Sequence, residues 1–240
     1  MIEIRKGDTV RDRALQAVIF DLDGVIANTV EHYYHAGKRL ADEINIPYDR
    51  ELNQKVQGLN RYKQVEIMLG DKFKDYSEEE IRELGDRRSH YYLEKITTFS
   101  SKDVLPGMVD FLIELKEKQI KTALASASSN AFEVVDKLDV RKYLDIIVDI
   151  KKINNGKPDP EIFLTAANLL NVKPINCVAI EDGEAGLTGI LQTDMFSIGV
   201  GEHEAMRKAD WRVMSTDEIT LNRLLHEWEN KPSVKLLTTK

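Results

Sequence analysis

The fold is decided by residues 17–26, which read Ala-Val-Ile-Phe-Asp-Leu-Asp-Gly-Val-Ile. The apolar run predicts a buried strand that ends in two carboxylates one residue apart, Asp21 and Asp23, and Gly24 then lets the chain turn away. Such a pair suits a cation site at a strand end. One aspartate can attack phosphorus while the other moves protons, and Mg²⁺ offsets the repulsion between an anionic nucleophile and a phosphate.

Strand-like runs recur along the chain, separated mainly by segments with helical spacing. The expected strands are 17–20, 121–125, 146–148, 177–180 and 196–200, and the expected helices are 108–117, 131–138, 161–170, 185–191 and 219–228. This alternation predicts an α/β fold, a Rossmann-like and mainly parallel sheet with helices on both faces. In such sheets the chemistry gathers at the carboxyl ends of the strands.

One interval, residues 29–103, breaks the alternation, because it contains only helical patterns, at 31–44, 60–69 and 78–92. A crossover between parallel strands needs only about a dozen residues or slightly more, so we expect an inserted α-helical cap domain. The predicted organisation is a core of residues 14–28 and 104–230, a cap of residues 29–103, and disordered ends at 1–13 and 231–240.

Composition narrows the class of protein. A formal net charge of -7 argues against electrostatic nucleic-acid binding, and no segment approaches transmembrane length. The single cysteine, Cys177, rules out an internal disulfide and fits a reducing compartment. The charged N-terminus lacks the apolar stretch of a signal peptide. We therefore expect a cytoplasmic monomer whose partners are small molecules.

Three further segments follow apolar runs with polar residues suited to phosphate chemistry. Residues 124–128 place hydroxyls and backbone N–H groups after a strand, residues 156–160 hold Lys157 in a stiff loop, and Glu181 and Asp182 end another strand. An acidic pair can complete a Mg²⁺ site, and a fixed lysine can balance phosphoryl charge. Each segment taken singly also has a plain structural explanation. Residues 124–128 could cap a helix, Lys157 could be a solvated loop lysine, and Glu181 and Asp182 could form an acidic turn.

The order of these four pieces resembles the haloacid dehalogenase-like superfamily of phosphotransferases. The resemblance implies that Asp21 is the phosphorylated nucleophile and Asp23 the general acid/base. It also implies that Ser126 and Lys157 hold the phosphoryl group. The implied Mg²⁺ ligands are Asp21, the backbone carbonyl of Asp23, Glu181 and Asp182.

Further segments resemble the β-phosphoglucomutase family: Gly58-Leu59-Asn60-Arg61, Leu105-Pro106-Gly107, residues 157–163 and residues 198–201. The resemblance spans residues 17–201. It implies conversion of β-glucose 1-phosphate to glucose 6-phosphate through bound glucose 1,6-bisphosphate, with Arg61 gripping the phosphate that is not being transferred. The other positions it implies for substrate or phosphate binding are Thr29, Gly58, Ala127, Ser128 and Asn130.

Departures from the family pattern concentrate around the sugar. Tyr33 stands where the family has histidine, Gln64 where it has serine, and Arg88 and Ser89 where it has lysine and asparagine. After Ser128, Ser129 replaces a lysine. We expect Tyr33, Gln64 and Arg88 to line the sugar site, where they could preserve glucose phosphate or select another hexose phosphate.

Two other functions stay open at this point. A capped phosphatase acting on a small sugar phosphate could use the same aspartates, serine and lysine, with water in place of the sugar hydroxyl. A catalytically silent binding protein could share the fold. A dehalogenase is disfavoured, because displacing a carbon–halogen bond requires neither Asp23 nor the metal-site acids.

Overall fold

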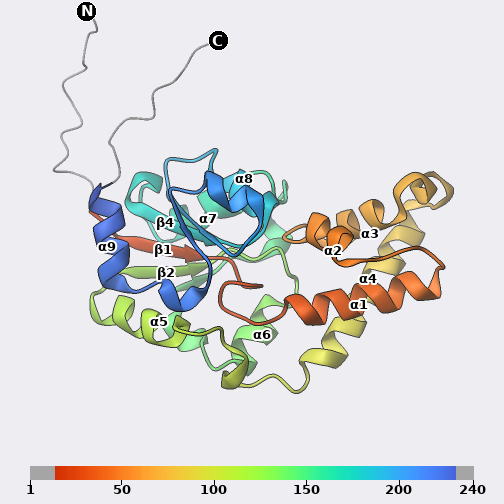
Figure 1. Ribbon diagram of the computed structural model, residues 1–240, viewed down its shortest axis with the longest axis horizontal. Helices are drawn as coiled ribbons and strands as arrows, with labels where there is room; N and C mark the ends of the chain where they lie inside the picture. The colour runs from red at the N-terminus through yellow and green to blue at the C-terminus, as the bar shows by residue number, and fades with distance from the viewer. Residues whose placement is uncertain (1–13, 231–240) are drawn as a thin grey trace, which may run out of the picture.

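A parallel sheet forms the centre of the computed structural model, which describes residues 14–230 (Figure 1). The strand order is β3-β2-β1-β4-β5-β6, and every neighbouring pair is parallel. The strands are β1 (Ala17–Phe20), β2 (Lys121–Leu124), β3 (Ile146–Ile147), β4 (Cys177–Glu181), β5 (Phe196–Val200) and β6 (Trp211–Val213). Phe20 pairs with Leu124 on one side and Ile180 on the other, so the three central strands end side by side.

Helices cover both faces of the sheet because the buried strands alternate their side chains. Val18 and Phe20 pack in an apolar cluster with α5 (Met108–Glu117), α6 (Ala131–Lys137) and α9 (Leu221–Asn230). Ala17 and Ile19 pack on the other face with α7 (Glu161–Leu169) and α8 (Glu184–Ile190). The predicted fold class is confirmed.

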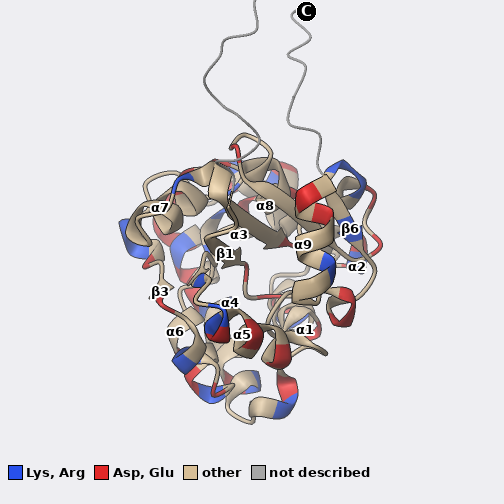
Figure 2. Cartoon of the chain, turned by 90° about the vertical axis from the view of Figure 1, so that its left-hand side faces the viewer, with Lys and Arg blue, Asp and Glu red and all other residues tan. Residues whose placement is uncertain are grey.

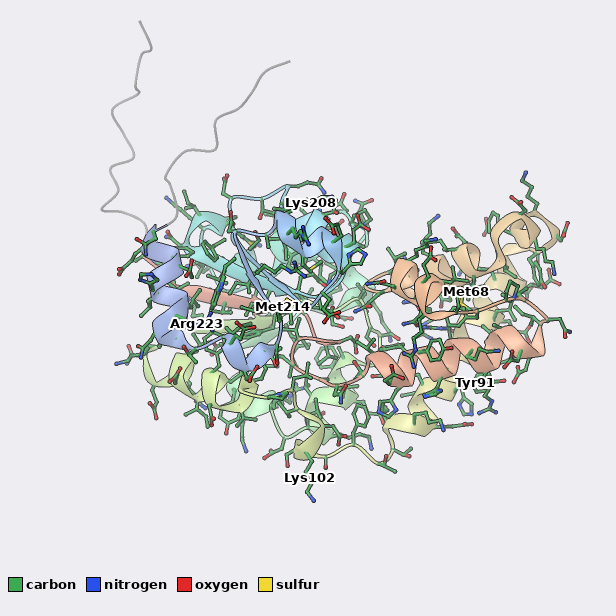
Figure 3. All side chains as sticks on the ribbon, viewed as in Figure 1. Met68, Tyr91, Lys102, Lys208, Met214 and Arg223 are labelled. Atoms are coloured by element: carbon green, nitrogen blue, oxygen red, sulfur yellow. The ribbon has the colours of Figure 1, made fainter. Side chains whose placement is uncertain are left out.

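Between β1 and α5 the described chain forms no strand. It forms four helices instead, which we call the helical group: α1 (Val30–Glu43), α2 (Arg50–Val56), α3 (Arg61–Leu69) and α4 (Glu78–Ile96). α4 packs against both α1 and α3. Met68 of α3 and Tyr91 of α4, both labelled in Figure 3, are buried within this group. Figure 1 shows the helical group beyond the carboxyl ends of the strands.

The sequence pattern did not predict two elements, β6 and α2. β6 is three residues long with Arg212 at its centre, so it shows no apolar run. α2 is seven residues long and begins at an N-cap, Asp49, whose side chain accepts from the Leu52 N–H. The last helix begins at Leu221 rather than 219, because residues Thr216–Glu218 form a 3₁₀ turn. The ends expected to be disordered, 1–13 and 231–240, lie outside the described residues.

The surface mixes charges of both signs. Figure 2, which views the end of the molecule away from the helical group, shows acidic and basic residues interspersed. Among residues 14–230, no helix is both long and apolar enough to cross a membrane.

Candidate active site

Three of the predicted segments meet at the carboxyl end of β1. Asp21 follows this strand, is only 4% exposed, and donates its backbone N–H to the Ile180 carbonyl at 3.0 Å. The buried Lys157 Nζ donates to Asp21 Oδ1 and, at 2.7 Å, to Glu181 Oε2. Ser126, also buried, lies just past the end of the neighbouring strand β2. Residues 136 positions apart in sequence thus form one charged cluster.

Asp21, Glu181 and Asp182 form a group suited to a cation. Each offers a carboxylate oxygen, and the three oxygens lie within 4.8 Å of one another. Two glycines make room for these side chains, since a Cβ at Gly24 would collide with the Asp182 carboxylate and one at Gly186 with that of Glu181.

Burial disfavours the ionised forms of these acids. Burial, followed by repulsion from Asp21, raises the pKa of Glu181 to about 7. Burial and the neighbouring Glu181 raise the pKa of Asp182 well above its ordinary value. Carboxylate oxygens are the ligands that Mg²⁺ prefers, and its charge would balance this crowding. The residues present therefore fit a divalent cation.

Lys157 remains charged in this cluster. Burial opposes the ammonium form, but the Asp21 and Glu181 carboxylates outweigh burial and raise the pKa of Lys157 above its ordinary value. Within the cluster it is the positive group that faces the nucleophile candidate directly, because its Nζ contacts Asp21 Oδ1.

Asp23 forms one hydrogen bond with Asp21 and one with Thr29. Its backbone N–H donates to Asp21 Oδ2 at 2.9 Å, and its Oδ1 accepts from Thr29 Oγ1 at 2.5 Å. Burial, then the charge of Asp21, raises the pKa of Asp23 to about 7. A carboxyl group with a pKa near neutrality can both give and take a proton, as a general acid/base requires.

A cavity of about 590 Å³ separates the strand ends from the helical group. Of the predicted site residues, those that line it are Asp21, Asp23, Tyr33, Gly58, Arg61, Gln64, Arg88, Ala127, Ser128 and Asn130. Thr29, Ser126, Lys157 and Glu181 are instead buried, and Asp182 is partly buried. Thr29 contacts Asp23 directly, so its position is beside the acid/base candidate.

Hydrogen bonds join the loop after β2 to three helices of the helical group. Tyr33 Oη of α1 donates to Ser128 Oγ at 2.8 Å, and Asn130 Nδ2 donates to Ser89 Oγ of α4 at 3.1 Å. Arg61, at the start of α3, donates to Ser129 Oγ and pairs with Asp86 at 2.7 Å. The cavity is thereby bridged on this side by residues 128–130.

Two buried polar atoms on the cavity wall have no hydrogen-bond partner among the described residues, Arg88 Nε and Gln64 Oε1. Arg88 is 3% exposed and lies 5.4 Å from the centre of the Tyr33 ring, which stacks on Tyr92 at 4.0 Å. A buried donor or acceptor without a partner is costly. One unpaired donor and one unpaired acceptor suit the hydroxyl groups of a ligand.

Two further residues that line the cavity were not predicted from the sequence: Asn53 of α2, and Gln57, which follows that helix. Asn53 Oδ1 accepts from Tyr48 Oη at 2.8 Å, and the Gln57 amide donates to Asp182 Oδ2. Asp49 with Glu51 two residues later is a helix N-cap and an acidic first turn, a signal that predicts α2. No signal in the sequence places Gln57 beside Asp182.

Comparisons with known proteins identify the family of the chain. Residues 15–193 match the haloacid dehalogenase-like hydrolase family. The chain is 42% identical over 217 residues to β-phosphoglucomutase of Bacillus subtilis, covering 90% of this chain and 96% of that protein. It is 32% identical over 176 residues to a phosphorylated carbohydrates phosphatase of Thermotoga maritima, covering 72% and 79%.

A solved structure is similar as well. The crystal structure of β-phosphoglucomutase from Clostridium difficile superposes with a TM-score of 0.86 at 39% identity, covering 89% of this chain and 97% of that one.

Proposed function

The chain belongs to the haloacid dehalogenase-like hydrolase family, and we propose that it is a Mg²⁺-dependent sugar phosphate mutase that interconverts β-glucose 1-phosphate and glucose 6-phosphate. One observation carries the choice of a mutase. Asp21 and Asp23 line the same cavity as Arg61, which comes from the helical group. That arrangement gives a bisphosphate one phosphate site at the nucleophile and a second at the guanidinium.

In this mechanism Asp21 first takes a phosphoryl group from glucose 1,6-bisphosphate: the carboxylate attacks phosphorus, the bond to the sugar oxygen breaks, and Asp23 gives its proton to that oxygen. The 6-hydroxyl of β-glucose 1-phosphate then attacks the aspartyl phosphate and passes its proton to Asp23, which forms glucose 1,6-bisphosphate again. Attack of Asp21 on the 1-phosphate of this intermediate releases glucose 6-phosphate and restores the aspartyl phosphate. Lys157 and Ser126 would hold the phosphoryl oxygens. Two observations support these roles: Lys157 contacts Asp21, and Ser126 is buried just past the end of the adjacent strand β2.

The ligands we assign to Mg²⁺ are Asp21, Glu181, Asp182 and the backbone carbonyl of Asp23. When bound, the ion would neutralise charge between the nucleophile and the phosphate. The close grouping of three carboxylate oxygens supports this assignment.

We assign residues 29–103, which include the helical group, the role of a cap. A mutase must keep water from the aspartyl phosphate and offer a sugar hydroxyl in its place. Hydrogen bonds from α1, α3 and α4 to residues 128–130 support closure over the cavity. Thr29, Gly58, Ala127, Ser128 and Asn130 would complete the phosphate surroundings, and Tyr33, Gln64 and Arg88 the sugar surroundings.

The second candidate is a phosphatase acting on a small sugar phosphate. It is favoured by the 32% identity to a phosphatase of phosphorylated carbohydrates and by the changes at Tyr33, Gln64 and Arg88. One assay separates the two: the protein is incubated with Mg²⁺, β-glucose 1-phosphate and a trace of β-glucose 1,6-bisphosphate. We expect glucose 6-phosphate to accumulate with little inorganic phosphate. Phosphate release without isomerisation would reject the mutase.

Replacing the distal phosphate ligand should separate the two activities. In Arg61→Ala we expect mutase turnover to fall roughly 10- to 100-fold, because a charge-assisted hydrogen bond contributes about 1.5–3 kcal/mol. Hydrolysis of a simple phosphate ester, measured as phosphate release, should change little. The matched control is Arg82→Ala, an exposed arginine of α4. Equal loss of both activities in Arg61→Ala would count against the assignment.

Asp23→Asn should slow turnover by about 10²- to 10⁴-fold, because the amide cannot exchange the proton of the sugar hydroxyl. Mg²⁺ affinity, measured by titration calorimetry, should stay within about twofold of the wild type, since the ligand we propose at this position is the backbone carbonyl. Undiminished turnover would remove Asp23 from the acid/base role, and a large loss of Mg²⁺ affinity would show that its side chain holds the ion.

A further inference from the structure

Gln57, which follows the last residue of α2, links the helical group to the metal-site acids. Its side-chain amide donates to Asp182 Oδ2, across a sequence separation of 125 residues. Gln57 lines the cavity but has no role in the proposed mechanism.

Backbone packing also brings the two segments together. A Cβ at Gly183 would lie 3.6 Å from the Gln57 carbonyl oxygen, and a Cβ at Gly58 would lie 3.9 Å from the Gly186 nitrogen. Gly58 has a left-handed φ of 76°, which favours glycine. The end of α2 therefore packs on the start of α8 at two points. The position of Gln57 beside Asp182 does not depend on one side-chain conformation.

The carboxylate of Asp182 lies in a crowded position among other acids. Gly24 packs closely against its carboxylate, so that a Cβ there would collide with it. Two further carboxylates, those of Asp21 and Glu181, complete the group of three. A neutral amide donor that reaches one oxygen favours the ionised carboxylate and fixes its direction, leaving the other oxygen free for a cation.

The remaining side-chain hydrogen bonds described above between the helical group and the core reach residues 128–130. That loop follows β2, whereas Asp182 follows β4, on the other side of the central strand β1. Of these hydrogen bonds between the helical group and the core, the one from Gln57 contacts a metal-site acid.

We propose that Gln57 is a positioning residue, which orients Asp182 to bind the cation and so couples docking of the helical group to cation binding. This rests on the proposed Mg²⁺ site but not on which sugar is the substrate. Coupling is reciprocal, so bound Mg²⁺ must favour the docked end of α2 by the factor by which docking favours Mg²⁺.

The test is Mg²⁺ affinity, measured by titration calorimetry on the whole protein without substrate. We expect Gln57→Met, which keeps the length of the side chain but not the donor, and Gln57→Ala both to bind Mg²⁺ about tenfold more weakly than the wild type. The matched control, Gln54→Ala, removes an exposed glutamine of α2 and should bind Mg²⁺ as tightly as the wild type. Wild-type affinity in Gln57→Met would overturn the proposal.

Hydrogen exchange gives the reciprocal readout. Saturating Mg²⁺ should slow amide exchange at residues 50–58 in the wild type and leave it unchanged in Gln57→Met. Equal slowing in both would also overturn the proposal. The outcomes are independent of the mutase assay: a protein that isomerises the sugar phosphate but binds Mg²⁺ equally well without Gln57 rejects only this inference. Gln57-dependent Mg²⁺ binding without isomerisation rejects only the mutase.

Discussion

Asp21→Asn is expected to abolish turnover, by on the order of 10⁵-fold or more, because a neutral amide is a poor nucleophile toward phosphorus. The fold should survive, since the side chain keeps its size and the backbone N–H still donates to the Ile180 carbonyl. The direct measurement is intact-protein mass spectrometry after mixing with β-glucose 1,6-bisphosphate. The wild type should gain one phosphoryl group and the variant none.

The control for this experiment is Asp194→Asn, an exposed aspartate that does not line the cavity, which should keep wild-type turnover. A phosphorylated Asp21→Asn protein would show that another residue is the nucleophile.

Lys157→Met is expected to lower the free energy of unfolding by about 3–5 kcal/mol, the cost of breaking a buried ion pair by removing one partner. Lys157 is 4% exposed, and it is bonded to the buried carboxylates of Asp21 and Glu181. Without the ammonium group, these acids lie unpaired beside each other. The measurement is denaturant unfolding at neutral pH without Mg²⁺, compared with Lys152→Met, which replaces an exposed lysine five residues earlier.

The loss in Lys157→Met should also depend on pH. Burial raises the pKa of Glu181 to about 7 even with the lysine present, and removing the lysine raises it further. A carboxyl whose folded-state pKa exceeds its unfolded value loses stability as the pH rises through the folded-state pKa. The variant should therefore be least stable relative to the wild type near about pH 8 and recover toward about pH 5. A loss that is independent of pH would contradict this view of the cluster.

The core of the fold could be predicted because its strands are short apolar runs that differ sharply from the segments between them. Ala17–Phe20 and Phe196–Val200 have the predicted bounds, and both are wholly buried. β6 could not be found in this way, because it is a three-residue strand at the edge of the sheet and carries a partly exposed arginine, Arg212. The hydrogen bond from Arg212 Nε to the Gly201 carbonyl is a contact that no local pattern predicts.

The grouping of the candidate site residues at the strand ends could be predicted, whereas the cavity wall formed by the helical group could be predicted only in part. Asp21, Lys157 and Glu181 come together because parallel strands end at one edge of the sheet, so their contact follows from topology. The placement of Gln57 and Asn53 depends on how the helical group sits over that edge. That packing is tertiary, and neither periodicity nor spacing records it.

Single-turnover partitioning measures whether the phosphoryl group on Asp21 passes to a sugar hydroxyl, as we propose, or to water. The enzyme is phosphorylated with radiolabelled β-glucose 1,6-bisphosphate in Mg²⁺, separated rapidly, and mixed with excess β-glucose 1-phosphate. We expect most of the label to appear in sugar phosphates, as new bisphosphate and then glucose 6-phosphate, and little in inorganic phosphate. Label released as inorganic phosphate, at a rate that the sugar phosphate does not change, would contradict transfer to the sugar.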